Sequence, residues 1–150
     1  MSFAANKVRQ GAAGVSTGYD IPNSLRFNDD DSAYLEWTPS SAGNRAKWTW
    51  SGWVKRGNLG EQDIFGAGTA SAGFLKFRSD GVLQFGDYTS GYVFQLRSNA
   101  LYRDTSAWYH IVAVFDTANS TATHRQRLYV NGSEVSYGTQ TNTTTANDIN

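Results

Sequence analysis

The stretch SAWYHIVAVFDTANSTATHRQRLYVNGSEV, residues 106–135, decides the fold expected for this chain. Residues 108–115 are mainly aromatic and β-branched, which predicts a strand. Because side chains alternate along a strand and both faces here are mostly apolar, we expect this strand to be central and covered on both sides. A polar loop follows, and residues 125–130 resume a strand. Asn131-Gly132 is typical of a type I′ hairpin turn, which predicts that residues 134–137 return beside that strand.

The chain before this stretch shows the same pattern of short strands and turns. KWTWSGWVK, residues 47–55, predicts a second central strand, in which Gly52 leaves a gap for Trp48 or Trp50 to fill. Further strands are expected at 25–27, 34–37, 64–65, 74–78, 82–88 and 92–97. Turns rich in Asp, Asn and Gly separate them at about eight-to-twelve-residue spacing, which predicts an all-β fold, an antiparallel β-sandwich. The expected core includes Trp50, Val54, Ile111, Val112, Val114 and Leu128.

The two ends differ from the region between them. Residues 1–20 show no strand or helix periodicity, which leaves two interpretations, a disordered tail or an extended arm that becomes ordered on a neighbouring subunit. The apolar residues that would anchor such an arm are Phe3, Val8, Val15 and Tyr19. Residues 138–150 are a polar tract in which we expect no strand. The expected division is therefore 1–20 for the arm and 21–150 for the sandwich.

The amino-acid composition limits the kinds of partner that we expect this chain to bind. The 13 Lys and Arg residues balance 13 Asp and Glu, so neither nucleic acid nor an anionic membrane surface is favoured as a partner. The chain has no cysteine, which removes disulfides and thiolate chemistry. Its apolar runs are too short for a membrane span, so we expect no membrane insertion.

Three segments, taken in order, resemble the concanavalin-A-like and laminin-G-like lectin and glucanase superfamily. They are SLRFNDDDSAYLEW at 24–37, KWTWSGWVKR at 47–56, and WYHIVAVFD followed by LYVNG within 108–132. Two further segments, PSSAGNR at 39–45 and RDTSAWYHIV at 103–112, are most similar to versions in virion proteins of marine tailed phages, often tail fibres. The resemblance covers about residues 24–150.

The resemblance implies a jelly-roll sandwich of two antiparallel sheets. In the family further strands follow at about residue 138, usually with a G-x-(L/I)-(A/D)-E motif, and this sequence has no such motif. We therefore expect the closing strands to be missing from this chain. Either the native polypeptide continues beyond Asn150, or an open sheet edge pairs with another subunit.

The resemblance also implies a function. It indicates a non-catalytic structural or attachment protein on the surface of a tailed phage virion, with a lectin-like domain that binds host-surface glycans. The implied partners are other virion proteins, held through residues 1–20, and further copies of the chain, as in trimeric fibres. Two alternatives stay open: a glycan-active hydrolase of the same superfamily, and a secreted adhesive carbohydrate-binding module.

Candidate catalytic carboxylates are sparse. Glucanases of the resembled superfamily carry acids at alternate positions of one strand, as in E-x-D-x-x-E, which brings two carboxylates close enough for glycoside hydrolysis. The nearest match is Glu61-Gln62-Asp63, which lies in a predicted turn and lacks the third acid. We interpret these as solvated loop charges, and predict no catalytic residue and no enzymatic activity.

Candidate metal ligands are equally sparse. Asp29-Asp30-Asp31 has the oxygen chemistry of a calcium site without the spacing of a defined calcium loop, so we interpret it as a turn. Asp116 matches an aspartate of the family and is expected to cap the following loop. His110 and His124 have no third ligand at metal spacing, and His110 is expected to be a hydrogen-bonded core residue. We expect no cofactor or metal, calcium being the one ion that the resemblance leaves open.

The aromatic residues divide into core and surface candidates. Trp48, Trp50, Trp53 and Trp108 lie in predicted central strands and are interpreted as core. Trp37, Tyr88 and Tyr92 flank predicted turns, so their rings are the better candidates for stacking on a sugar.

Overall fold

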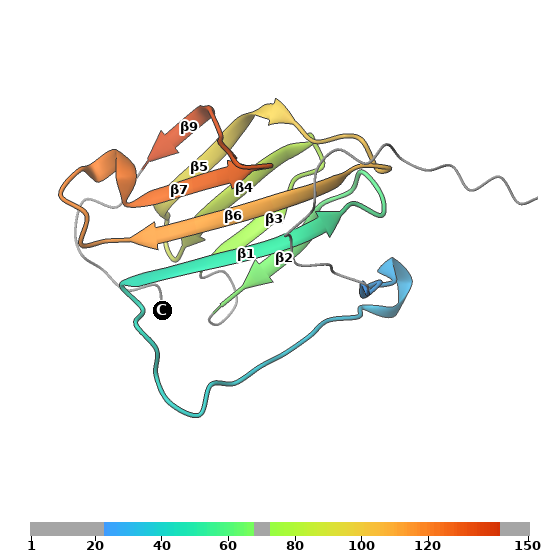
Figure 1. Cartoon of the computed structure of the whole chain (residues 1–150), viewed down its shortest axis with the longest axis horizontal. Helices are drawn as coiled ribbons and strands as arrows, with labels where there is room; N and C mark the ends of the chain where they lie inside the picture. The colour runs from blue at the N-terminus through green and yellow to red at the C-terminus, as the bar shows by residue number, and fades with distance from the viewer. Residues whose placement is uncertain (1–22, 68–72, 142–150) are drawn as a thin grey trace, which may run out of the picture. The chain divides into compact units, whose positions relative to one another are not determined.

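The computed structural model describes residues 23–67 and 73–141 (Figure 1). The chain divides into two units, Met1–Glu36 and Trp37–Asn150, which are described separately. In the first unit the described residues contain one short 3-10 helix, η1 (Asp29–Asp31). The second unit contains all the strands of the described chain.

The second unit consists of two antiparallel sheets. The four-stranded sheet has the order β1 (Lys47–Lys55), β6 (Trp108–Asp116), β7 (Gln126–Val130), β8 (Ser133–Glu134). The five-stranded sheet has the order β2 (Gln62–Gly66), β3 (Phe74–Phe77), β4 (Val82–Tyr88), β5 (Tyr92–Leu101), β9 (Tyr137–Thr141). A short 3-10 helix, η2 (Ala122–His124), precedes β7. The predicted all-β sandwich is confirmed, and Figure 1 shows the two sheets as facing layers.

The core lies between the inner faces of the two sheets. The five-stranded sheet contributes Leu75, Phe77, Leu83, Phe85, Phe94 and Leu96, and the four-stranded sheet contributes Ile111, Ala113, Phe115 and Leu128. Trp48 joins the layers, because its ring stacks on Phe115 at 5.5 Å and meets Phe85 edge-on at 5.8 Å. Each such apolar side chain contributes roughly 1.5–3 kcal/mol when fully buried.

Strand β6 differs from its prediction on one face. Its inner face is buried as expected, but Trp108 is 46% exposed and Val112 and Val114 are only half-buried, so these valines are not core. The outer face meets cross-strand neighbours on β1 and β7 within its own sheet, since Val112 pairs with Ser51 and Tyr129. Apolar β-branched residues favour a sheet face even without a covering layer, which is why the sequence suggested burial on both sides.

Strand β1 confirms the predicted alternation. Trp48, Trp50 and Val54 pack against the core, and the Trp50 ring fills the gap at Gly52, where an added Cβ would lie 2.7 Å from it. Trp53 was predicted to be core and is 53% exposed, because it faces outward from a sheet with no described layer outside it.

The polar tract after residue 138 was predicted to lack a strand, and this is wrong. β9 runs through Tyr137–Thr141 and pairs with β5. Tyr137 also ties β9 to β7 of the other sheet, because its hydroxyl accepts a hydrogen bond from the backbone N–H of Leu128 at 2.8 Å. Threonine favours strands, so a polar sequence is compatible with this edge position. Residues 142–150 lie outside the described residues.

The expected strands at 25–27 and 34–37 are absent from the described residues. The turn between them does form: Asn28 Nδ2 donates to Asp31 Oδ2 at 2.8 Å, and Ser32 is left-handed with a φ of 49°. The flanking residues have no ladder partner in the described chain, and a strand needs one to satisfy its backbone groups. Alternation of apolar residues alone was therefore misleading here.

The connection from β1 to β2 is built on a buried arginine. Arg56 is 2% exposed, and its guanidinium donates to the carbonyl oxygens of Tyr102 and Gly60, both at 2.7 Å, and to Gln62 Oε1 at 3.1 Å. Its charge also lies over the Phe77 ring, 4.8 Å from the centroid. Desolvation by burial lowers the pKa of Arg56 from its ordinary value. This arginine closes one end of the core.

Candidate functional site

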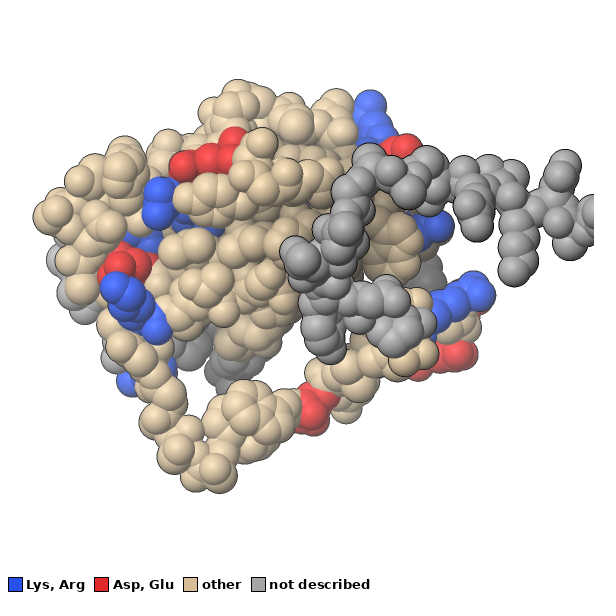
Figure 2. Space-filling view, viewed as in Figure 1, with Lys and Arg blue, Asp and Glu red and all other residues tan. Residues whose placement is uncertain are grey.

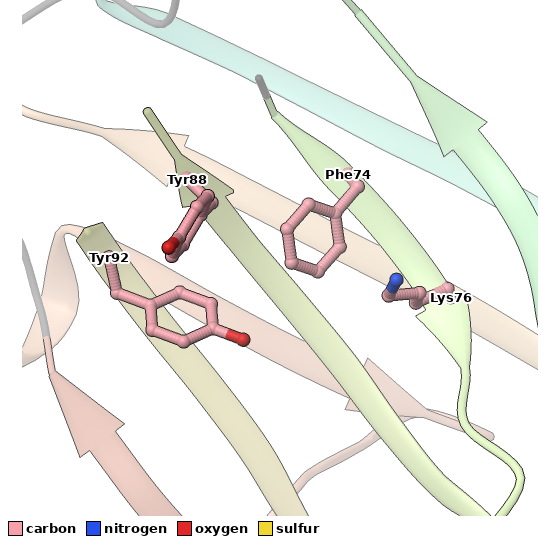
Figure 3. Close-up of a pocket in the computed structure, with 4 residues that line it drawn as sticks. All are labelled: Phe74, Lys76, Tyr88 and Tyr92. Carbon is pink, nitrogen blue, oxygen red and sulfur yellow. The ribbon is translucent and has the colours of Figure 1, made fainter. Parts of the chain in front are cut away.

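A surface pocket of about 260 Å³ lies on the outer face of the five-stranded sheet (Figure 3). It is lined by Phe74 and Lys76 from β3, Tyr88 from the end of β4, and Tyr92 from the start of β5. The two tyrosines are cross-strand partners whose rings meet edge-on at 5.1 Å. They are 41% and 45% exposed, so a ligand can reach both.

Gly86 makes room for the third ring. It pairs with Phe74 across the sheet, and a Cβ at this position would lie 2.9 Å from Phe74 Cζ. Real Cβ atoms do not approach so closely, so the ring occupies space that only a glycine leaves free. Phe74 can therefore lie against the sheet and form one wall of the pocket.

A buried glutamine, Gln84, is hydrogen-bonded to one of the residues that line the pocket. Gln84 on β4 is fully buried, although it belongs to the outer face and pairs with Lys76 and Arg97 on the neighbouring strands. Its Oε1 accepts a hydrogen bond from Arg78 Nη1 at 3.0 Å, and its Nε2 donates to Tyr92 Oη at 3.3 Å. Gln84 thus fixes the Tyr92 ring in place.

Charged side chains lie beside Gln84 on the neighbouring strands. Lys76 Nζ donates to Glu61 Oε1 at 2.7 Å and lies 4.8 Å from the centroid of the Phe74 ring. The hydrogen bond from Lys76 is the main reason that the pKa of Glu61 is lowered, and desolvation by burial acts in the other direction. Farther along the face, Asp80 accepts from Arg97 at 2.7 Å.

Such an arrangement has the chemistry of a small-ligand site. Three aromatic rings supply apolar surface, while an ammonium and two phenol hydroxyls supply directional hydrogen bonds. Its position on strands β3, β4 and β5 keeps the side chains fixed relative to one another.

The structure brings together two of the three predicted ligand residues. Tyr88 and Tyr92 share the pocket, whereas Trp37 lies in the irregular segment before β1, is 83% exposed and does not line it. Sequence reasoning missed Phe74 and Lys76. Their alternate spacing on one strand placed them on one face, but the sequence did not say which face met solvent. The arm residues Phe3, Val8, Val15 and Tyr19 lie outside the described residues.

The carboxylates of Glu61 and Asp63 sit at one edge of the same sheet. Asp63 was predicted to lie in a turn and instead belongs to edge strand β2, where it is the cross-strand partner of Lys76. The alternating acidic and polar residues around it resembled a turn because they contain few apolar side chains.

The outer face of the four-stranded sheet carries a second aromatic group. Trp53 and His110 are cross-strand partners with ring centroids 5.1 Å apart, and His110 Nε2 lies 3.1 Å from Ser51 Oγ. His110 is thus hydrogen-bonded as expected but half-buried on a surface rather than core, and Trp108 is likewise exposed. Figure 2 shows this face, on which most of the visible surface belongs to uncharged residues.

Residues 23–67 and 73–141 contain no cluster of side chains that could bind a metal ion. No group of three or more His, Cys, Asp and Glu residues is placed to hold an ion there. Asp116 was expected to cap its loop, but its Oδ2 pairs with Lys47 Nζ at 2.9 Å, so the carboxylate is directed to strand β1 instead. Within the same described ranges, no helix has the length and apolar character of a membrane span.

Comparison with known proteins identifies the class. Residues 29–150 match the model of the concanavalin A-like lectin/glucanases superfamily, a laminin-G type of domain. The match covers most of the chain, and the two facing antiparallel sheets agree with it. The chain therefore belongs to the concanavalin A-like lectin/glucanase superfamily. Searches of curated proteins and of solved structures returned no match.

Proposed function

We propose that this chain is a non-catalytic carbohydrate-binding protein, and that it holds a glycan on the outer face of the five-stranded sheet. The observation that carries the proposal is the pocket in which the exposed rings of Tyr88 and Tyr92 stand beside Phe74. The C–H faces of sugar rings are apolar and pack on aromatic rings, while the sugar hydroxyls need a few fixed polar partners. Lys76 and the two tyrosine hydroxyls supply those partners.

The same geometry supports binding over hydrolysis. A glycosidase needs one carboxylic acid whose pKa is raised, so that it can protonate the leaving oxygen. The acid nearest the pocket, Glu61, has a lowered pKa because Lys76 donates to it, so it is ionised at neutral pH. Its hydrogen bond to Lys76 suits a positioning role better than proton donation.

Alanine variants test the binding proposal. Tyr88→Ala and Tyr92→Ala should each weaken retention by immobilised polysaccharides about tenfold or more, because each removes a stacking ring. Trp53→Ala removes a comparably exposed ring from the other sheet and serves as the matched control. If Trp53→Ala weakens polysaccharide retention equally, or if both tyrosine variants retain the polysaccharide, the pocket is not the glycan site.

We place this binding protein on the surface of a tailed phage virion, as a tail fibre or similar appendage that contributes to host attachment. The support is the similarity of residues 39–45 and 103–112 to virion proteins of marine phages. In this proposal residues 1–20 dock on neighbouring virion proteins or on further copies of the chain, a trimer being the arrangement of comparable fibres. Ordering such an arm costs roughly 1–2 kcal/mol per residue, which requires many contacts in the particle.

Deletion of residues 2–20 tests this placement. The truncated chain should keep the melting temperature of its sandwich and should be missing from purified particles, as judged by mass spectrometry. Normal incorporation of the truncated chain would show that docking uses another surface, such as a sheet edge.

A further inference from the structure

We propose that the pocket of Phe74, Lys76, Tyr88 and Tyr92 selects sugars that carry an oxyanion, a carboxylate or a sulfate, and binds that group between Lys76 Nζ and Tyr92 Oη. This inference rests on the proposed function and deepens it, because it names the class of glycan. It follows from the direction of the hydrogen bonds around Gln84 and from the second donor that Lys76 brings to the pocket.

The hydroxyl of Tyr92 is set to donate. Arg78 has only donors, so the Gln84 atom that it contacts must be the amide oxygen. The amide nitrogen of Gln84 then points at Tyr92 and donates to its oxygen. With that lone pair engaged, Tyr92 keeps its own proton for a ligand. A half-buried contact between Arg78 and Gln84 thus sets the direction of the hydrogen bond at the Tyr92 hydroxyl.

Lys76 adds a second donor. An ammonium has three N–H groups and no acceptor, and one of them is used by Glu61. The Lys76 side chain is 19% exposed and its Nζ is held near the Phe74 ring, which limits its freedom to leave the pocket. Hydrogen bonds from a cation to an oxyanion are about twice as strong as neutral ones.

Three acidic side chains, Glu61, Asp63 and Asp80, lie on this face of the sheet, and two of them are paired with cations. Glu61 pairs with Lys76, and Asp80 accepts from Arg97 and lies 3.7 Å from Arg78 Nε. The remaining cation nearby, Arg103, donates to the Asp80 carbonyl, and the remaining acid is Asp63 of β2. Four cations therefore stand against three carboxylates on this face as a whole, while Lys76 is the one charged residue, among those that the structure describes, that lines the pocket.

Asp87 does not alter this balance in the pocket. It precedes Tyr88 but is 3% exposed and pairs with Phe94 of the core, so its side chain belongs to the inner face of the sheet. Burial raises the pKa of Asp87 from its ordinary value. An anionic sugar on the outer face therefore does not meet this carboxylate.

Three polymers with a related backbone test the inference in isothermal titration calorimetry of the full chain. They are neutral galactan, polygalacturonate and a sulfated galactan. We expect at least one of the anionic polymers to bind about tenfold more tightly than galactan. Preference for polygalacturonate identifies a carboxylate, and preference for the sulfated polymer identifies a sulfate. Galactan binding that equals or exceeds both would overturn the inference and leave the proposed function standing.

Two variants test whether the preference for an anionic polymer arises in the pocket. Lys76→Gln and Tyr92→Phe should each reduce the preference for the anionic polymer, while the aromatic rings continue to hold galactan. Lys55→Gln makes the same change of charge on an exposed residue of β1 and should leave the preference intact. An equal effect of Lys55→Gln would show that general electrostatic attraction, and not the pocket, selects the anion. If the wild-type chain binds none of the three polymers, that result would count against an anionic ligand. If it instead binds other glycans and Tyr88→Ala abolishes that binding, the proposed function would still be supported.

Discussion

The ring of Phe74 lies against Gly86, its cross-strand partner, so closely that a Cβ on the glycine would be 2.9 Å from Phe74 Cζ. The same Cβ would lie 3.3 Å from the backbone oxygen of Phe94, which cannot easily move. One glycine in the middle of the sheet therefore decides where an aromatic ring of the pocket can lie.

Gly86→Ala should displace the Phe74 ring and weaken glycan binding, and should also cost about 1–3 kcal/mol of stability through overpacking. Gly66→Ala is the matched control, because Gly66 pairs with Phe74 from the other side and a Cβ added there would meet nothing within 4 Å. Urea denaturation and calorimetric titration measure the two effects. Unchanged glycan binding by a folded Gly86→Ala variant would show that the Phe74 ring does not shape the site.

The tryptophans of β1 should differ sharply in their effect on stability. Trp48→Ala should cost about 3–5 kcal/mol, because Trp48 contacts Phe115 and Phe85 across the core. Trp53→Ala should cost less than about 1 kcal/mol, because the ring is 53% exposed. Chemical denaturation gives both values, and similar losses for the two variants would mean that a further layer covers the outer face.

Arg56 should be essential for folding. Arg56→Met leaves the carbonyl groups of Gly60 and Tyr102 without their donors, which should cost roughly 3 kcal/mol or more. Arg56→Lys keeps the charge but cannot reach all three acceptors, so it should recover little of the loss. Lys55→Met, at the exposed neighbouring position, should change stability by less than about 0.5 kcal/mol. A melting temperature that Arg56→Met leaves unchanged would contradict this reading of the buried guanidinium.

Tyr137 predicts how stability changes at high pH. Burial raises the pKa of Tyr137 to about 12, above its ordinary value of 10.0. Between these values the unfolded chain releases the proton and the folded chain retains it, so the stabilisation present below pH 10.0 is lost as the pH rises towards 12.

Unfolding experiments at several pH values between neutral and strongly alkaline test this behaviour. Tyr137→Phe should remove much of the alkaline loss and should lower stability at neutral pH by about 1–3 kcal/mol, since Leu128 N–H loses its acceptor. Tyr129→Phe, on the half-buried outer face of β7, is the control and should keep the alkaline loss. An alkaline loss that is identical in Tyr137→Phe would assign the effect to other groups.

The strands in which apolar and polar residues alternate strongly were predictable from the sequence, and so were the short turns between them. Ile111 and Leu128 lie in the core as expected, and Asn131-Gly132 adopts the left-handed conformations that the hairpin requires. What failed depended on partners distant in sequence. The strand at Tyr137 pairs with β5 and is tied to Leu128 of the other sheet through the tyrosine hydroxyl, and no local pattern contains either contact.

The candidate site was half predictable for the same reason. Tyr88 and Tyr92 flank one turn, so a hairpin brings them together from local sequence alone. Phe74 and Lys76 join them only once the register of β3 on β4 is fixed. Gln84 is oriented by its hydrogen bond with Arg78. The sequence shows only a glutamine inside an apolar strand and does not indicate this partner.

The most direct test of a glycan site on the five-stranded sheet is an NMR titration. The ¹⁵N-labelled chain is titrated with oligosaccharides prepared from whichever polymer it retains, and amide shifts are followed. The account predicts that the largest changes fall on β3, the end of β4 and the start of β5, around Lys76, Gly86 and Tyr92. Changes concentrated instead at Trp53, His110 and Trp108 on the other sheet would contradict it.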